Sequence, residues 1–224
     1  MSHPVQLRVL EGLTPYDQGL ALQRNILQQR QRDACPDTLL LLEHPPVITL
    51  GVSAPDSAIV ASREALAQQG IAVHQTERGG QATWHGPGQI VGYPIFNLHH
   101  RKLGVARYIA TLEDMMMRAS DLLGVPAMRR TGLTGVYASA SPHGKIGAIG
   151  VRVSLGVTWH GFAFNACPDL SHYRLIVPCG ASDIPVTSVQ QQRSQPVDVA
   201  TARSAVIDAF AETFRVTFAS RDIA

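Results

Sequence analysis

Residues 78–89 read RGGQATWHGPGQ, so four glycines, a proline, a tryptophan and a histidine fall within twelve positions. Glycine is favoured where the backbone adopts unusual dihedral angles or lies close against another group. A surface linker has no need of Trp84 and His85 between the two glycine pairs, and residues 86–88 (Gly-Pro-Gly) are poorly suited to a central strand. We therefore interpret this stretch as the wall of a ligand pocket, with backbone amides and a few polar side chains facing the ligand.

The composition of the whole chain is that of an ordinary globular protein. It has 224 residues, of which 45% are hydrophobic and 16% charged, and its formal net charge is +2. That charge is too small to indicate nucleic-acid binding. No apolar run approaches the ~20 residues that span a bilayer, and the N-terminal residues 1–4 lack the features of a secretory signal. We expect a cytoplasmic protein that binds neither nucleic acid nor membrane.

Hydrophobic periodicity predicts strands and helices without a regular βαβ alternation, which favours an α+β fold with a mixed or antiparallel sheet flanked by helices, in a single domain over residues 1–224. The predicted strands cover 5–10, 39–42, 47–50, 71–73, 90–98, 136–137, 146–155 and 157–164, and the predicted helices 14–32, 62–69, 104–123 and 198–214.

Several details of these elements can be predicted from local patterns. Thr14 is expected to be the N-cap of the first helix, with Pro15 at its first position. Leu155-Gly156 is expected to form a hairpin turn. The helix over 104–123 is expected to bury one face, which comprises Val105, Tyr108, Ile109, Leu112, Met116, Ala119 and Leu123.

The three cysteines, Cys35, Cys167 and Cys179, are an odd number without metal-site spacing, so they predict neither a disulfide framework nor a zinc site. Cys179 follows an apolar run and stands between Pro178 and Gly180, a pattern that could present a thiol on a tight loop. A nucleophilic cysteine usually needs a base or a cation beside it. The residues alone leave open whether Cys179 is a nucleophile or a small buried hydrophobic residue.

Lys145 is one of only two lysines, the other being Lys102, in a chain whose remaining basic residues are arginines. Three glycines surround it in the segment 144–150, which is unusual for a solvated lysine. Burial there would disfavour the charged form, lower the lysine pKa and allow it to accept a proton. Codon bias would also explain why lysine is scarce. An anion-binding lysine beside glycine amides would also explain the glycines around Lys145.

The nine histidines show no metal-binding spacing, and we expect no metal site. His85 and His160 are interpreted as polar groups of the pocket or as ordinary core histidines. A cysteine hydrolase that uses either one as its base stays open at this point.

Five segments in a fixed order give a more specific indication than any single motif. They are residues 78–89, Thr134-Gly135-Val136, Lys145–Gly150 (KIGAIG), His160–Asn165 (HGFAFN) and Pro178-Cys179-Gly180. From the strand pair at 44–46 nearly to its C-terminus, the chain resembles the lipoate-biosynthesis octanoyltransferases, also called lipoyl(octanoyl) transferases. The resemblance implies a biotin/lipoate protein ligase-like α+β fold.

The resemblance also implies a cysteine–lysine dyad in which Lys145 activates the nucleophile Cys179. It implies octanoyl transfer from octanoyl-acyl carrier protein to a lysine of apo lipoyl domains (the glycine cleavage H protein and the 2-oxoacid dehydrogenase E2) through a Cys179 thioester, without a cofactor or a metal. The substrate-pocket residues that carry over are Arg78, Gly79, Gly80, Gln81, Ala82, Thr83, Trp84, His85, Ala148, Ile149, Gly150, Gly161, Phe162 and Ala163.

Three other functions compete with this reading. An ATP-dependent lipoate-protein ligase of the same fold would not need a nucleophilic cysteine. A cysteine thioesterase would release free octanoate, and a non-catalytic acyl- or nucleotide-binding module would bind without turnover. The pairing of Lys145 with Cys179, each beside glycine, argues against the last of these.

Overall fold

The computed structural model describes residues 4–141, 143–177 and 184–223. Its largest element is a mixed eight-stranded sheet in which β1 runs parallel to β11 and β2, and the remaining neighbours are antiparallel. The strands lie in the order β11 (Phe218–Ile223), β1 (Val5–Leu13), β2 (Asp37–Glu43), β6 (Gln89–Ile95), β10 (Val157–Asn165), β9 (Lys145–Ser154), β8 (Leu133–Ala138) and β7 (Ala127–Arg130).

A separate three-stranded sheet carries the first half of the glycine-rich stretch. Its order is β4 (Ala72–Gln75), β3 (Val47–Leu50) and β5 (Ala82–His85), with β3 parallel to β4 and antiparallel to β5. Helix α2 (Arg63–Gln68) and the 3-10 turns η1 (Asp56–Ala58) and η2 (Leu170–Leu175) accompany it. Ile48, Leu66, Trp84 and Ile176 are buried together in the core of this unit.

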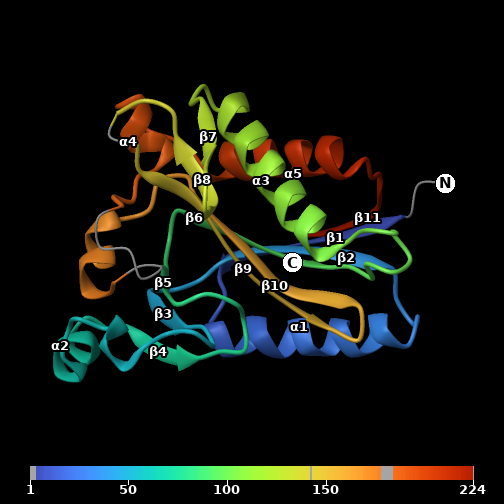
Figure 1. Ribbon diagram of the computed structural model, residues 1–224, viewed down its shortest axis with the longest axis horizontal. Helices are drawn as coiled ribbons and strands as arrows, with labels where there is room; N and C mark the ends of the chain where they lie inside the picture. Colours follow the sequence, from blue (N-terminus) through green and yellow to red (C-terminus); the bar gives the residue numbers. More distant parts are fainter. Residues whose placement is uncertain (1–3, 142, 178–183, 224) are drawn as a thin grey trace.

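Helices cover both faces of the large sheet (Figure 1). Helix α1 (Tyr16–Gln31) lies against one face, beside β2, β6 and β10, and α3 (Val105–Leu122) and α5 (Val199–Phe214) lie together on the other. The short helix α4 (Val189–Arg193) precedes α5. The main hydrophobic core fills the layer between the sheet and α3 and α5, because the apolar side of each helix can be removed from water only against the sheet.

The predicted α+β class and mixed sheet are confirmed, as are most of the predicted elements. Strand β2 is buried on both faces, as its continuous apolar run predicted. Leu155 and Gly156 both have positive φ, 49° and 77°, as a two-residue hairpin turn between β9 and β10 requires.

Some local predictions were wrong. The N-cap of α1 is Pro15, not Thr14, and the Thr14 N–H donates instead to the Glu43 carbonyl. Val105 is 45% exposed although it lies on the helical face that we expected to be buried, because it borders an open cleft together with Ile109 and Val151. Strands β5, β7 and β11 were not predicted, and β5 forms inside the glycine-rich stretch because Ala82–His85 pairs with β3.

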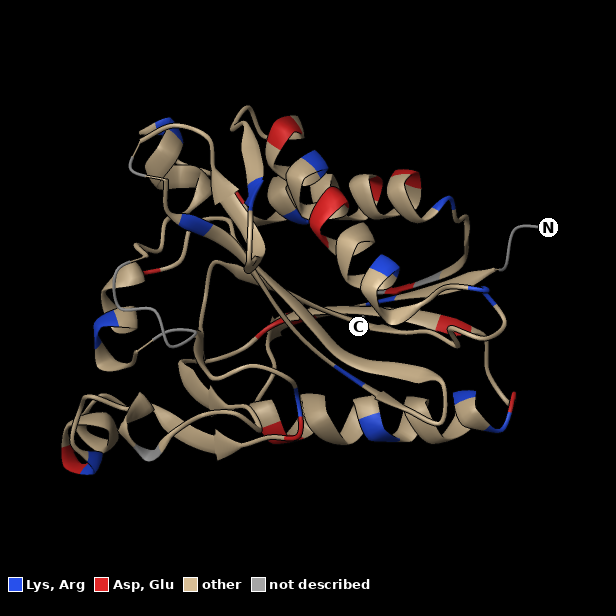
Figure 2. Ribbon diagram, in the orientation of Figure 1, with Lys and Arg blue, Asp and Glu red and all other residues tan. Residues whose placement is uncertain are grey.

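Charges of both signs are distributed along α1 and α3 (Figure 2), in keeping with the small net charge. Among the described residues, no helix is both long enough and apolar enough to cross a membrane.

Candidate active site

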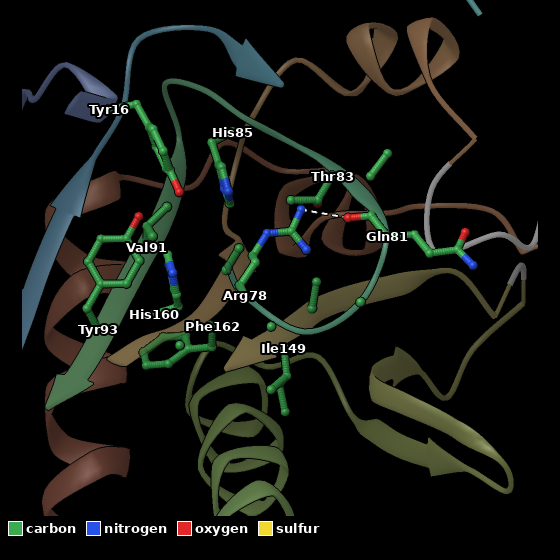
Figure 3. Close-up of a pocket in the computed structure, with 16 residues that line it drawn as sticks. Tyr16, Arg78, Gln81, Thr83, His85, Val91, Tyr93, Ile149, His160 and Phe162 are labelled. Carbon is green, nitrogen blue, oxygen red and sulfur yellow. Dashed lines mark hydrogen bonds between the residues drawn. The ribbon is translucent and has the colours of Figure 1, made fainter. Parts of the chain in front are cut away.

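A cavity lies between β5, β6, β9 and β10, next to the first turn of α1 (Figure 3). The cavity brings together all but two of the residues predicted to bind substrate. It is lined by Tyr16, Arg78, Gly80, Gln81, Ala82, Thr83, His85, Val91, Tyr93, Ala148, Ile149, Gly150, His160, Gly161, Phe162 and Ala163.

The two predicted residues that do not line the cavity are Gly79 and Trp84. Side chains alternate between the two faces of a strand, so Thr83 and His85 reach the cavity from β5 while Trp84 points into the core of the small sheet. There the Trp84 ring packs edge-on against Tyr173, 5.6 Å between ring centroids. Gly79 lines a neighbouring cleft instead.

Three lining residues, Tyr16, Val91 and Tyr93, were not among the predicted site residues. They come from the first turn of α1 and from β6, which pairs with β10 in the large sheet. Nothing in their local sequence distinguishes them from core residues. His160 had been interpreted as a polar group of the pocket or as a core histidine, and it lines the cavity.

Small residues on β9 and β10 leave room for the cavity. In the antiparallel register Gly150 faces Gly161, and Ala148 faces Ala163. Gly161 is also needed for close strand packing, because a Cβ there would lie 2.1 Å from the Gly92 carbonyl oxygen. The small residues of HGFAFN thus allow close contact between β10 and β6 and also leave space for the cavity.

Arg78 fastens the glycine-rich loop to the small sheet. Its side chain is buried, and its guanidinium donates to the Thr49 carbonyl (2.7 Å), the Thr49 hydroxyl and the Gln81 carbonyl (2.7 Å). Charge-assisted bonds of this kind are stronger than neutral ones. Arg78 therefore holds the 78–81 wall in place and sets a positive charge beside the cavity.

Three buried histidines lie in and behind the cavity. His44 Nδ1 lies 2.7 Å from the Thr14 carbonyl, which can only accept, so Nδ1 carries the proton and Nε2 accepts from the Tyr93 hydroxyl at 2.8 Å. Burial lowers the His44 pKa to about 4. Burial, with smaller effects from nearby charges including Arg78, lowers the pKa of His85 and of His160 to about 3. All three imidazoles are therefore neutral at physiological pH.

His85 is held by a hydrogen-bond network that ties the two sheets together. Its Nδ1 lies 2.7 Å from Gln89 Oε1. The Gln89 amide in turn donates to the Trp84 carbonyl (3.3 Å) and to Asn165 Oδ1 (2.9 Å). This network fixes the amide orientation of Gln89, since only its nitrogen can donate to a carbonyl, and it directs the His85 ring into the cavity.

Lys145 begins β9 and lines an open cleft that adjoins the cavity. The two share part of their walls, comprising Gly80, Gln81, Ile149 and Gly150. Lys145 is half-buried, not enclosed, and its Nζ lies 5.3 Å from the centroid of the Tyr137 ring. The lysine is thus placed beside the mouth of the cavity.

Gly147, two residues after Lys145, is required for helix–strand packing. A Cβ at Gly147 would lie 2.6 Å from Met116 Sδ, so this residue lets α3 approach β9. The glycine-rich surroundings that drew attention to Lys145 therefore have, in part, a structural cause that sequence reasoning missed.

Cys179 lies outside the described residues, which stop at Val177 and resume at Ile184. The chain that follows it pairs directly with Lys145, because the Lys145 N–H donates to the Pro185 carbonyl (2.8 Å) and the Thr187 N–H donates to the Lys145 carbonyl (3.0 Å). Of the described cysteines, Cys35 and Cys167 are free thiols, and burial raises the pKa of both. Neither has the features of an activated nucleophile.

Comparison with known proteins shows the family to which the chain belongs. The chain matches the family described as lipoyl protein ligase A/B catalytic domain over residues 15–211. It is 49% identical over 183 residues to an octanoyltransferase of Koribacter versatilis, covering 81% of this chain and 73% of that protein. It is 42% identical over 204 residues to an octanoyltransferase of Alkaliphilus metalliredigens, covering 91% and 92%.

Solved structures of low sequence identity share the fold. A bipartite lipoate protein ligase from Thermoplasma acidophilum superposes with a TM-score of 0.75 at 18% identity, over 98% of this chain and 88% of that one. A lipoate-protein ligase A bound with ATP gives 0.73 at 15% identity, over 100% and 90%. The predicted ligase-like architecture is thereby confirmed.

Proposed function

Since this chain belongs to the octanoyltransferases within the lipoyl protein ligase A/B catalytic family, we propose that it moves an octanoyl group from the phosphopantetheine thioester of acyl carrier protein to a lysine of an apo lipoyl domain. The acceptors are the glycine cleavage H protein and the 2-oxoacid dehydrogenase E2. We propose that residues 1–224 form one catalytic domain for this reaction, with the acyl chain in the cavity and the thioester at its mouth.

The observation that carries this proposal is the shared wall between the cavity and the Lys145 cleft. An acyl chain in the cavity would pass the Gly80-Gln81 and Ile149-Gly150 segments where it leaves for the cleft. Its carbonyl would then lie on the side of Lys145, whose backbone pairs with Pro185 and Thr187 a few residues after Cys179. Apolar lining groups such as Phe162 support a hydrocarbon tail, each buried methylene of which contributes about 0.8 kcal/mol.

In the proposed first step Lys145 accepts the Cys179 thiol proton, and the thiolate attacks the thioester carbonyl. The carbon–sulfur bond to phosphopantetheine breaks, and that sulfur leaves with the proton held by Lys145. The product is an octanoyl thioester on Cys179. Because one thioester replaces another, the step is close to balanced in energy and needs no ATP.

In the second step the ε-amine of the acceptor lysine attacks the Cys179 thioester. The Cys179 sulfur leaves as the thiol after Lys145 passes it a proton taken from the attacking nitrogen, and a more stable amide remains. Backbone amides would stabilise the oxyanion, an effect of about 3 kcal/mol per donor in other enzymes. Gly79 is not one of these donors, because its N–H already donates to the Val151 carbonyl (3.0 Å).

Intact-mass spectrometry after mixing with octanoyl-acyl carrier protein tests this function. We expect one octanoyl adduct, absent in Cys179→Ala and retained in Cys35→Ala, and transferred to an apo H protein on its addition. An adduct on Cys167 would overturn the assignment of the nucleophile. Octanoylation by Cys179→Ala from octanoate and ATP would indicate a ligase, and release of free octanoate without an acceptor would indicate a thioesterase.

A second experiment isolates the role of Lys145. In Lys145→Arg the positive charge is retained but the group cannot deprotonate at neutral pH. We expect acylation of Cys179 to slow by at least a hundredfold in Lys145→Arg, while Lys102→Arg, the only other lysine in the chain, acts at the original rate. Equal rates in both variants would exclude Lys145 as the proton acceptor.

A further inference from the structure

One end of the cavity is polar, although the proposed substrate has a purely hydrocarbon tail. Tyr16, Tyr93, His85 and His160 gather there, away from Ile149 and the mouth (Figure 3). His160 is 1% exposed, and among the described residues its Nε2 has no hydrogen-bond partner. A buried ring nitrogen left without a partner is unfavourable, because it loses its hydrogen bond to water and gains none in return.

The position of His160 shows that this end of the cavity is built around it. Its backbone has φ = 52°, a left-handed conformation that few residues other than glycine adopt. Its N–H donates to Gln23 Oε1 (2.9 Å), and its ring stacks on Trp159 with 4.3 Å between centroids. These contacts hold the imidazole so that its edge lies by the Tyr16 and Tyr93 side chains.

The charge at this end selects the kind of group that fits. His85 and His160 are neutral, and burial raises the pKa of Tyr16 to about 12, so it too is uncharged. Arg78 is charged, and its guanidinium donates hydrogen bonds to the Thr49 and Gln81 carbonyls. An uncharged group that can both donate and accept a hydrogen bond suits this environment, and a hydroxyl is the smallest such group.

We propose that the polar end of the cavity binds a hydroxyl at the far end of the acyl chain, so that the protein transfers ω-hydroxyacyl groups in preference to unsubstituted acyl groups with the same number of heavy atoms. The proposal rests on the proposed octanoyl transfer and extends its substrate class. A terminal methyl pressed against His160 Nε2 leaves that buried nitrogen without a hydrogen-bond partner, whereas a hydroxyl can donate to it.

Competition between isosteric thioesters tests the proposal. Equimolar 8-hydroxyoctanoyl- and nonanoyl-acyl carrier protein are offered together with an apo H protein, and the product ratio by mass spectrometry gives the ratio of kcat/KM. The pair 9-hydroxynonanoyl and decanoyl is run in the same way, to cover a chain that reaches the polar end at a different length. We expect at least a tenfold preference for the hydroxylated chain in one of the two pairs.

Variants connect the preference to the polar end. His160→Phe removes the ring nitrogens, and Tyr16→Phe removes only a hydroxyl, so it serves where His160→Phe does not fold. We expect either change to bring the ratio to within about threefold of one. His99→Phe makes the same ring exchange at an exposed residue and should keep the original ratio.

A parallel measurement of octanoyl transfer distinguishes failure of this inference from failure of the proposed function. If octanoyl is not transferred at all, the proposed function is wrong. If octanoyl is transferred but neither hydroxylated chain is preferred, the proposed function stands and the hydroxyl site is wrong. A preference that survives unchanged in both His160→Phe and Tyr16→Phe also overturns the hydroxyl site.

Discussion

The three buried histidines make the stability of this protein depend on pH between 5 and 7. In the folded chain the pKa is about 4 for His44 and about 3 for His85 and His160, against 6.5 for an ordinary histidine. As the pH falls below 6.5 the unfolded chain binds a proton at each site and the folded chain does not. The stabilisation is therefore complete above pH 6.5 and is lost progressively as the pH falls towards 4 and then 3.

The size of the effect follows from these pKa values. Between pH 7 and pH 5 each histidine lowers the free energy of unfolding by roughly 2 kcal/mol, and the three together by about 6 kcal/mol. Carboxyl groups contribute little in this window, because unfolded Asp and Glu titrate near pH 4. A loss of this size is comparable to the whole stability of many domains.

Urea unfolding at pH 7, 6 and 5 measures this loss. The fluorescence of Trp84 and Trp159 reports unfolding, since both indoles are buried. His85→Gln removes one of the titrating groups and should reduce the difference between pH 7 and pH 5 by roughly 2 kcal/mol, whereas His99→Gln, at an exposed residue, should leave it as it was. A wild-type difference below about 1 kcal/mol would refute the reasoning, since it would mean that the histidines can be protonated without unfolding.

Other predictions concern residues that support the cavity and Lys145 from behind. Asp37→Ala removes a buried carboxylate bonded to two arginines and should lower the free energy of unfolding by about 3–5 kcal/mol in urea titrations. Gly92→Ala places a Cβ 2.2 Å from the Phe162 ring; overpacking of about 1–3 kcal/mol should push that ring into the cavity and lower kcat/KM for octanoyl at least fivefold. Tyr137→Leu removes the ring whose centroid lies 5.3 Å from Lys145 Nζ and should slow the acylation of Cys179, because the amine loses the aromatic face beside it.

Two of these predictions have a matched control variant, and the third has an outcome that would contradict it. Glu212→Ala breaks the exposed pair with Arg118 and should cost less than about 1 kcal/mol, so an equal loss in Asp37→Ala would contradict the importance of burial. Tyr137→Phe keeps the aromatic face and should keep the wild-type rate of acylation; a loss as large as that of Tyr137→Leu would point to the hydroxyl instead. For Gly92→Ala, unchanged octanoyl transfer would show that the Phe162 ring moves elsewhere.

Much of this protein could be predicted from local sequence because the signals were local. Apolar runs and helical periodicity located β2, β3, β10, α3 and α5, and the ordered glycine-rich motifs indicated the family and most of the cavity wall. Such patterns succeed because strand and helix periods fix which side chains share a face, and because glycine is required where two backbones approach closely.

Only the tertiary structure decided which side of each element faces the cavity and what closes it. Trp84 lies within the most informative motif but points away, because pairing of β5 with β3 sets the alternation of its side chains. Tyr16 and Tyr93 reach the cavity from α1 and β6, and His160 loses its charge through burial that no local pattern encodes. The motif at 78–89 thus determined where the site lies, and long-range strand pairing determined its polar end, since depth and charge depend on neighbours distant in sequence.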